Sequence, residues 1–418
     1  MTTVENTESD LPLVTEKETL SNHFRSYIAR VRGGDIGSLP AIIGLAIAST
    51  VFGILRPNFV SERNFANLFQ QGAAVIFIAM GLVFVLLLGE IDLSAGFTSG
   101  VCAAAMAVLL TEHHWAWYWA VLIAIAIGVV TGLTLGVIVA KIRVPSFVVT
   151  LAAFLAFQGV QLKLLHDGQS VSIFDPTIIA INTNSMDPWI GWLMVGVFVI
   201  GYLAIQLSRR RSRQKRSLPT VPLSLIAIKT GTLLVIGGVS TALLNDQRSI
   251  NPAVSSIKGV PIIVPIILVV YLILDFTLSR TPYGRHIYAV GGNAEAARRA
   301  GIRVDRIRIS TFVICSTLAA ISGIVAASRQ SGVASTLGGS DVLLFAVGAA
   351  VIGGTSLFGG RGRVLDAILG GAVIAVISNG MDALNLAAGI KFIVTGLVLL
   401  AAATVDALSR RRAAVTGR

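Results

Sequence analysis

The chain has 418 residues, of which 54% are hydrophobic and only 13% are charged, and its formal net charge is +12. Ordinary soluble domains carry about 25% charged residues. The composition therefore excludes an ordinary soluble domain. It predicts an all-α polytopic membrane protein, because a helix satisfies its own backbone hydrogen bonds inside the hydrocarbon.

Twelve apolar stretches alternate with polar segments along the chain. At a rise of about 1.5 Å per residue, such stretches cross roughly 30 Å of hydrocarbon as helices. The third and the tenth are short and rich in glycine, so ten full spans with broken or re-entrant segments are an alternative. The expected spans are residues 37–55, 69–89, 96–111, 117–139, 146–165, 189–207, 221–244, 260–278, 309–327, 341–357, 364–380 and 389–408.

One transmembrane domain is expected over residues 36–408, between a polar N-terminal tail at 1–35 and a basic tail at 409–418. Within the domain, residues 188–259 form a helical hairpin whose inner loop carries the run "RRRSRQKR". With the N-terminus inside, most of the 33 lysines and arginines fall on the inner side. Both termini are therefore predicted to be cytoplasmic. The positive charge follows from this topology and needs no nucleic acid partner.

Chemistry that would mark an enzyme or a metal protein is missing from the sequence. The phosphate-binding pattern G-x-x-x-x-G-K-[ST] is absent, as are G-x-S-x-G and H-E-x-x-H, so we predict no ATPase activity, catalytic site or metal site in this chain. His113 and His114 follow Glu112 beside three tryptophans, a pattern typical of an interfacial belt. Cys102 and Cys315 lie inside predicted spans and are expected to be packing residues.

Few ionisable residues fall inside the predicted spans. Lys229 and Asp366 lie within spans, while Asp275, Asp382 and Lys391 lie near span ends, from which a side chain reaches the headgroups. Ion-coupled carriers retain buried charges for function. Because no acid and base pair stands at mid-depth, we expect the energy source to lie in another polypeptide.

Residues 279–309 form a long basic loop on the predicted inner side. Gly291 and Gly292 are expected to form a flexible turn. Asn293 is the expected N-cap of a helix of about two turns, and Gly301 fits its C-terminal stop. The helix-favouring residues between them are Ala294, Glu295, Ala296, Ala297, Arg298 and Arg299.

Several stretches resemble the ribose/xylose class of ATP-binding-cassette sugar permeases. "EAARRAG", which begins at Glu295, has the E-A-A-x-x-x-G spacing of the coupling loop in such importers. "RPNFVSERNFANLFQQGA", "GEIDLSAG", "KIRVPSFVVTLA", "GRHIYAVGGNAEAARRAGI" and "IGGTSLFGGRG" follow the order of the landmarks of that class. Glu90 departs from the family, which commonly has glycine there. The hairpin at 188–259 is similar to the longer, xylose-type members.

The resemblance implies a type II-like importer permease in a bacterial inner membrane. Two copies would form the pathway, a cytoplasmic ATPase would use ATP, and an extracytoplasmic binding protein would deliver a monosaccharide, with a pentose favoured. The chain itself would need no cofactor. The residues that the resemblance assigns to ATPase coupling are Gly291, Gly292, Asn293, Glu295, Ala296, Ala297, Arg298 and Gly301.

"GEIDLSAG", residues 89–96, and "GGTSLFGGRG", residues 353–362, are glycine-rich interruptions beside short apolar runs. We expect both to be broken-helix segments near the pathway. Asp92 and Ser94 are expected to cap the next helix, and Gly89 and Gly96 to let the chain turn. Glu90 is expected either beside lipid headgroups or facing the pathway.

Four more polar residues are candidates for the pathway: Gln70, Gln158, Thr355 and Asn379. Each also fits a hydrogen bond between helices. Three alternatives to a sugar permease remain. They are a permease for another small solute such as a nucleoside or a branched-chain amino acid, an ion-coupled secondary carrier, and a membrane enzyme.

Overall fold

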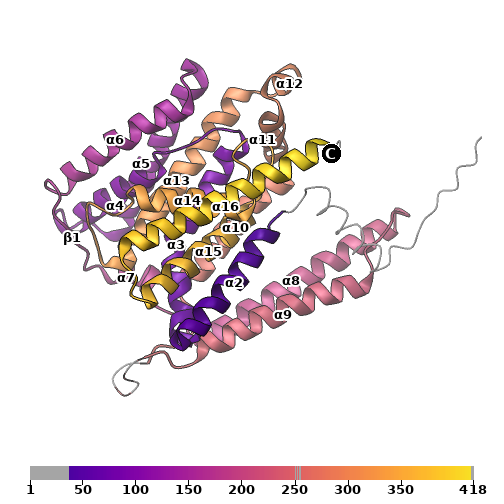
Figure 1. Ribbon diagram of the computed structural model, residues 1–418, viewed down its shortest axis with the longest axis horizontal. Coiled ribbons are helices and arrows are strands. Elements are labelled where there is room, and N and C mark those ends of the chain that lie inside the picture. The colour runs from indigo at the N-terminus through magenta and orange to yellow at the C-terminus, as the bar shows by residue number, and fades with distance from the viewer. Residues whose placement is uncertain (1–36, 250, 252, 254–255, 416–418) are drawn as a thin grey trace, which may run out of the picture.

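The computed structural model describes residues 37–249, 251, 253 and 256–415. The expected N-terminal tail at 1–35 and the last three residues of the C-terminal tail lie outside the described residues. In the described part the chain is a bundle of α-helices with one short two-stranded sheet (Figure 1). The all-α prediction is confirmed.

The helices follow one another with short connections. They are α2 (Leu39–Leu55), α3 (Glu62–Leu87), α4 (Ala95–Thr111), α5 (Trp117–Val137), α6 (Ser146–Leu164), α7 (Pro176–Thr183), α8 (Pro188–Gln214), α9 (Leu223–Asn245), α10 (Ile263–Arg280), α11 (Pro282–Gly292), α12 (Ala294–Arg299), α13 (Val304–Gln330), α14 (Ser340–Gly353), α15 (Val364–Ala383) and α16 (Ala388–Val415). A 3-10 turn, Pro57–Val60, precedes α3, and a π-helical turn, Ile138–Ile142, extends α5. Strands β1 (Val171–Ser172) and β2 (Gly332–Val333) pair antiparallel.

All twelve predicted apolar stretches are helical. Within the part of the chain that the structure describes, eight helices are long and apolar enough to cross a membrane: α3, α5 with its π turn, α6, α8, α9, α10, α13 and α15. The apolar parts of α2, α4, α14 and α16 are shorter. Among the described residues the structure thus has fewer long apolar helices than either the twelve expected spans or the ten full spans of the alternative, and it adds four shorter apolar helices.

Five predicted boundaries are wrong by four residues or more. Two of them are the start of α3, which lies at Glu62 and not at residue 69, and the end of α8, which lies at Gln214 and not at residue 207. The helix expected from residue 309 begins at Val304, so the end of the predicted coupling loop is already helical. The helix expected to run to residue 357 ends at Gly353, where Gly354 adopts a left-handed conformation with φ of +118°. The helix expected to end at residue 408 continues to Val415, through most of the predicted basic tail.

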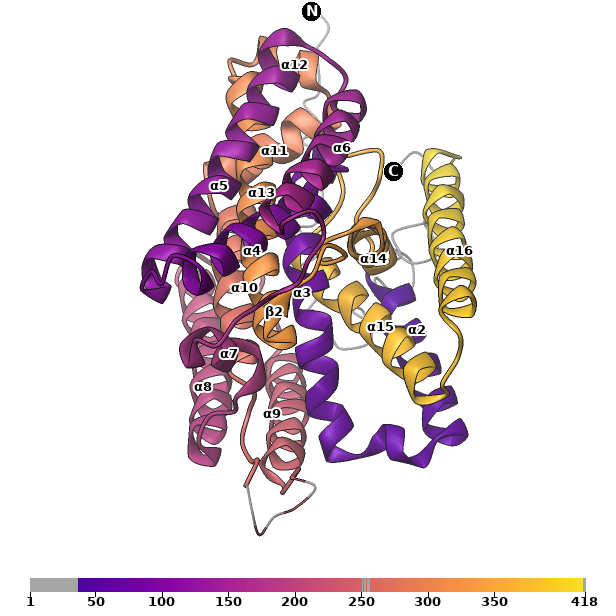
Figure 2. The same ribbon diagram turned by 90° about the vertical axis from the view of Figure 1, so that its left-hand side faces the viewer.

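Helices α3 and α13 form the centre of the bundle, as Figure 2 shows for α3. In their most apolar windows 78% and 61% of the residues are buried. Small residues bring α13 close to its neighbours: a Cβ atom on Gly81 would lie 2.9 Å from the Cα of Cys315. Cys102 and Cys315 are both buried and unbridged, which confirms that they are packing residues.

Helices α8 and α9 form the predicted hairpin, which lies along the edge of the bundle (Figure 1). Only 6% of the most apolar window of each helix is buried. An apolar cavity of about 230 Å³ separates part of the hairpin from α3 and α10. The hairpin is thus apolar in composition yet scarcely packed against the rest of the chain.

The segment between α13 and α14 returns into the bundle. Ser331 ends α13 in a left-handed conformation, and β2 then pairs with β1. Residue Gly338 lies against α4, so close that a Cβ on Gly96 would lie 2.7 Å from the Gly338 carbonyl oxygen. The Gln161 side chain donates a 2.9 Å hydrogen bond to the Leu337 carbonyl. Irregular backbone is therefore buried in protein here, the setting in which a membrane tolerates it.

Candidate functional site

Helices α11 and α12 make up most of the predicted coupling loop. Thr281 caps α11 by accepting the N–H of Gly284, and Pro282 occupies the first turn, where it loses no hydrogen bond. Gly291 and Gly292 are the last two residues of α11. The prediction of a flexible turn at these two glycines is wrong, because the helical hydrogen bonds continue through them.

The predicted N-cap of the short helix α12 is confirmed. The Asn293 side-chain oxygen accepts a 2.9 Å hydrogen bond from the N–H of Ala296. Glu295 lies in the first turn and pairs with Arg298 at 3.3 Å and Arg299 at 3.2 Å. Gly301 follows the helix with φ of +85°, a conformation that glycine adopts at little cost.

One face of α12 is fixed to the protein and the other is free. Ala297 is 5% exposed and packs into the hydrophobic core beside α13. Glu295, Ala296, Arg298 and Gly301 are exposed. Small and charged side chains are therefore presented outward on a helix whose inner face packs through Ala297 and the partly buried Ala294.

The end of α11 meets two other segments through their backbones. The N–H of Gly360 donates a 2.9 Å hydrogen bond to the Leu87 carbonyl at the end of α3. A Cβ on Gly291 would lie 1.9 Å from that same carbonyl oxygen, and a Cβ on Gly359 would lie 2.9 Å from the nitrogen of Gly89. We call this contact among residues 87–89, 291 and 359–360 the glycine junction. It joins the predicted coupling loop to both predicted broken-helix segments.

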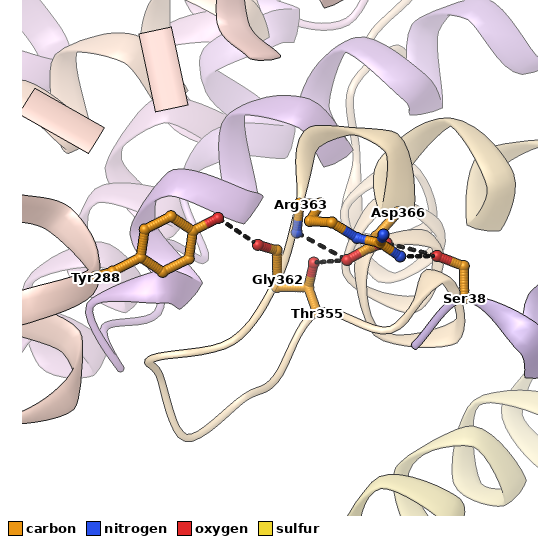
Figure 3. A network of polar contacts seen from close by, with 6 residues as sticks. All are labelled: Ser38, Tyr288, Thr355, Gly362, Arg363 and Asp366. Atoms are coloured by element: carbon orange, nitrogen blue, oxygen red, sulfur yellow. Dashed lines mark hydrogen bonds and ion pairs between the residues drawn. The ribbon is translucent and has the colours of Figure 1, made fainter. Parts of the chain in front are cut away.

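A polar network beside the junction ties α11 to the start of α15 (Figure 3). The Tyr288 hydroxyl on α11 donates a 2.7 Å hydrogen bond to the Gly362 carbonyl. Burial, together with the negative charge of Asp366, raises the pKa of Tyr288 to about 12. The hydroxyl is therefore protonated at neutral pH and acts as a hydrogen-bond donor.

Asp366 is the centre of that network and lies in the first turn of α15. Its carboxylate accepts 2.8 Å hydrogen bonds from the N–H of Arg363 and from the Ser38 hydroxyl at the start of α2. The Arg363 guanidinium donates to the same Ser38 oxygen at 2.6 Å, and Thr355 donates to Asp366 at 3.4 Å. Asp366 is thus a capping carboxylate with a cationic neighbour, and Thr355 belongs to this network.

Glu90 pairs with Arg308, and both side chains are mostly buried. The Glu90 Oε1 and Arg308 Nε atoms are 3.1 Å apart, with exposed fractions of 15% and 25% for the two side chains. The two expected positions, beside lipid headgroups or facing a pathway, stay predictions, and neither of them included this partner. Glu90 connects the segment after α3 to the first turns of α13.

The capping prediction for Asp92 and Ser94 is only partly right. The buried Asp92 carboxylate accepts hydrogen bonds from the Ser94 N–H at 2.9 Å and the Ser94 hydroxyl at 2.6 Å. Ser94 is the N-cap residue of α4, but its hydroxyl donates to Asp92 and accepts no helical N–H. Gly89, with φ of +74°, forms the expected turn. Gly96 does not: it lies inside α4 and allows the close approach of Gly338.

The remaining pathway candidates do not converge on one place. Gln70 on α3 donates to the Thr183 carbonyl at 3.4 Å. Asn379 on α15 donates to the Gln71 side chain of α3 at 3.1 Å. Gln158 lies on the exposed face of α6. Gln70 and Asn379 therefore hold helices together, while Gln158 is open to a neighbour or to solvent.

Three residues of the site escaped sequence analysis: Ser38, Tyr288 and Arg308. Their contacts join positions far apart in the chain, and Ser38 and Asp366 are 328 residues apart. A serine just before a span and a tyrosine within a basic loop carry no local signal for such contacts. Arg308 stood out only as one of many basic residues in the loop.

The fold defines an all-α protein with several helices long and apolar enough to cross a membrane, and the comparisons assign it to the transport permeases. A family model described as a branched-chain amino acid transport system / permease component matches residues 64–403, and the chain belongs to that family. The chain is 35% identical to the xylose transport system permease protein XylH of Haemophilus influenzae, over 89% of this chain and 96% of that protein.

Two further relatives agree with this assignment. XylH of Escherichia coli K12 is 33% identical over 85% of this chain and 87% of its own length. The ribose import permease protein RbsC of Escherichia coli K12 is 29% identical over 88% of this chain and 92% of its own length. All three relatives are transport permeases by name. No solved structure matches the chain.

Proposed function

We propose that this chain is the membrane-spanning permease subunit of an ATP-driven importer and forms the pathway for a monosaccharide, with xylose or another pentose favoured. The observation that carries the proposal is the 35% identity to a xylose permease over 96% of that permease's length. The α8–α9 hairpin supports the preference for xylose, because this extra hairpin resembles the longer, xylose-type permeases more than the shorter ribose-type ones.

The chain is placed in a bacterial inner membrane with both termini in the cytoplasm. The distribution of lysine and arginine supports this orientation. Its partners are a second copy of the chain, a cytoplasmic ABC ATPase, an extracytoplasmic sugar-binding protein and membrane lipid. ATP is bound and hydrolysed by the ATPase, so the chain itself carries no cofactor. No nucleic acid takes part.

The exposed face of α12 is the surface on which the ATPase docks. Its short side chains let a partner approach the backbone, and Arg298 and Glu295 offer charges of both signs. Closure of the ATPase moves α12 and, through it, α11. The glycine junction and the Tyr288 bond pass that movement to the ends of α3 and α15. The permease is thereby biased between outward-open and inward-open states.

Uptake measurements test this function. Cells that lack the permease gene are complemented with the wild-type chain or with Glu295→Trp, and uptake of radiolabelled xylose, ribose and leucine is compared. We expect xylose uptake by the wild type only, with both proteins present in the membrane in equal amounts. Arg299→Gln, a change at the edge of α12, is the matched control and should retain most of the uptake.

Two outcomes would overturn the proposal. Uptake of leucine but not of sugars would favour a branched-chain amino acid permease, the alternative that the description of the family model supports. Xylose uptake by the purified chain alone, in vesicles with an ion gradient and no ATP, would make it a secondary carrier.

A further inference from the structure

The α8–α9 hairpin has an unusual distribution of charge. Residues 188–245 contain no aspartate or glutamate. Six cations gather at the turn between the helices, and a seventh, Lys229, lies in α9 about one and a half turns beyond its first residue. The six are Arg209, Arg210, Arg211, Arg213, Lys215 and Arg216, and we call them the cationic collar.

The collar lies at a defined depth. Trp189 and Trp192, which are 63% and 51% exposed, begin α8 at its other end and fit an interfacial aromatic belt. The helix between Trp189 and Arg209 is roughly 30 Å long at about 1.5 Å per residue. That length equals the thickness of the hydrocarbon core, about 30 Å. The collar therefore begins at the level of the opposite headgroups.

The helix between these two levels faces lipid. Val197, Ile200 and Ile205 on α8 are 60%, 68% and 52% exposed. On the collar side, Leu218 and Leu223 remain 47% and 56% exposed among the cations. Apolar surface thus continues up to the collar, as expected of a boundary between acyl chains and headgroups.

The charges of the collar are free to bind something else. Arg210 donates to the Val221 carbonyl, while the other five residues are exposed. No ion pair within the described part of the chain involves the collar. Because consecutive helical residues point about 100° apart, Arg209, Arg210 and Arg211 cover most of the circumference of α8. The collar is therefore cationic in nearly every direction.

We propose that the cationic collar, assisted by Lys229, binds the headgroups of anionic phospholipids in the cytoplasmic leaflet. A charge that surrounds the end of a helix matches a layer of headgroups better than it matches one face of a protein. Clusters of this size directly beside a span are typical of anionic lipid binding. The exposed stem of Lys229 reaches from within the span toward the same layer.

A partner protein fits the collar less well. The segment proposed to receive the ATPase, α12, lies apart from the hairpin, as both views show (Figures 1 and 2). That segment presents charges of both signs, whereas the hairpin presents only positive ones. The lipid proposal rests on the proposed orientation of the chain but not on its substrate.

Spin-label electron paramagnetic resonance tests the proposal on the full-length purified protein. The chain is reconstituted in phosphatidylcholine bilayers that contain a trace of spin-labelled phosphatidylglycerol or of spin-labelled phosphatidylcholine, and the immobilised fractions are compared. We expect preferential immobilisation of phosphatidylglycerol. Salt at about 0.5 M should weaken the preference, because it screens charges at the surface.

Three variants isolate the collar. Replacement of Arg211, Arg213, Lys215 and Arg216 by glutamine should lower the preference by at least about fivefold. The charge-conserving variant R211K/R213K/R216K should keep it, as should R298Q/R299Q, which removes charge from α12. Size-exclusion profiles and the labelling of cysteines placed in the hairpin turn confirm that each variant folds and inserts in the wild-type orientation.

Three results would overturn the proposal. They are equal immobilisation of both lipids by the wild type, an unchanged preference in the glutamine variant, and a glutamine variant that loses ATPase binding while keeping its lipid preference. If the glutamine variant fails to insert, the salt dependence of the wild-type protein provides the test. A preference for phosphatidylglycerol that salt does not weaken would then contradict the proposal. None of these results depends on sugar uptake.

Discussion

Helices α3 and α8 are apolar stretches of almost the same length, 26 and 27 residues, yet they differ in what covers them. In the most apolar window of α3, 78% of the residues are buried in protein, against 6% in that of α8. Neighbouring helices of the chain cover the first, whereas the chain itself leaves most of the second uncovered. Hydropathy alone therefore identifies a span but does not say whether it packs against protein or lipid.

The bundle around α3 and α13, here called the body, differs from the α8–α9 hairpin in how closely the backbones of neighbouring helices approach one another. In the body, glycines face carbonyl groups of adjacent helices, as Gly132 of α5 faces Phe312 of α13. In the hairpin, Gly201 has nothing within 4 Å of the position of a Cβ atom. Lipid tails are as apolar as leucine, so close packing is what favours helix association in a membrane.

The largest effect is expected from a change to this packing. A Cβ on Gly132 would lie 2.5 Å from the Phe312 carbonyl oxygen, so Gly132→Val must separate α5 from α13. We expect a loss of about 3 kcal/mol or more in the free energy of unfolding. The matched change Gly201→Val in α8 should cost less than about 1 kcal/mol. Thermal unfolding in one detergent measures both, and equal losses would contradict the comparison.

The glycine junction offers the next contrast, between two adjacent residues. Gly291→Ala would place a Cβ 1.9 Å from the Leu87 carbonyl oxygen, whereas a Cβ on Gly292 has nothing within 4 Å. We expect Gly291→Ala to lower sugar uptake at least about tenfold, because α11 must move away from α3. Gly292→Ala should transport nearly as well as the wild type. Immunoblots of membranes control for the amount of protein, and similar uptake by both variants would mean that the contact does not matter.

Much of this architecture followed from local sequence signals. The twelve apolar stretches and the cap of α12 by Asn293 depend on residues within a few positions of one another. The junction does not: Leu87, Gly291 and Gly360 meet only because two helix ends and the loop between α14 and α15 arrive at one place. No local rule distinguishes Gly291, whose missing side chain lets α11 approach the Leu87 carbonyl, from Gly292, which has no neighbour within 4 Å of a Cβ position.

The differences between prediction and structure arise mostly from tertiary contacts. Gly96 and Gly291 were assigned to turns because glycine commonly marks turns, yet both lie in helices and serve close packing. Ser94 was assigned a cap, but its hydroxyl donates to Asp92, two residues earlier, and accepts no helical N–H. Glu90 had no predicted partner because Arg308 is distant in sequence. For Gly96, Gly291 and Glu90 the deciding contact is tertiary, whereas for Ser94 it is local.

An intermediate effect is expected from the polar network of the body. Asp366→Asn keeps the size of the side chain but removes the negative charge beside Arg363. Removal of one partner from a fully buried ion pair costs about 3 kcal/mol, because the other charge is left unpaired. Because Arg363 is itself 56% exposed, water offsets part of this, and we expect a loss of about 1–2 kcal/mol in the free energy of unfolding. Lys229→Gln, on the exposed surface of the hairpin, should change stability by less than about 0.5 kcal/mol. A loss for Asp366→Asn no larger than that for Lys229→Gln would show that the network does not stabilise the body.

The smallest effect is expected from Tyr288→Phe, which removes one neutral hydrogen bond to the Gly362 carbonyl while keeping the ring. The loss should be about 1 kcal/mol in the free energy of unfolding. Since the pKa of Tyr288 is raised to about 12, the donating form is present throughout the neutral range and is lost only as the pH approaches that value. The difference between wild type and variant should therefore stay constant from about pH 6 to 9. A difference that shrinks as the pH rises within that range would mean that the hydroxyl ionises and that it is not held as a donor between α11 and the start of α15.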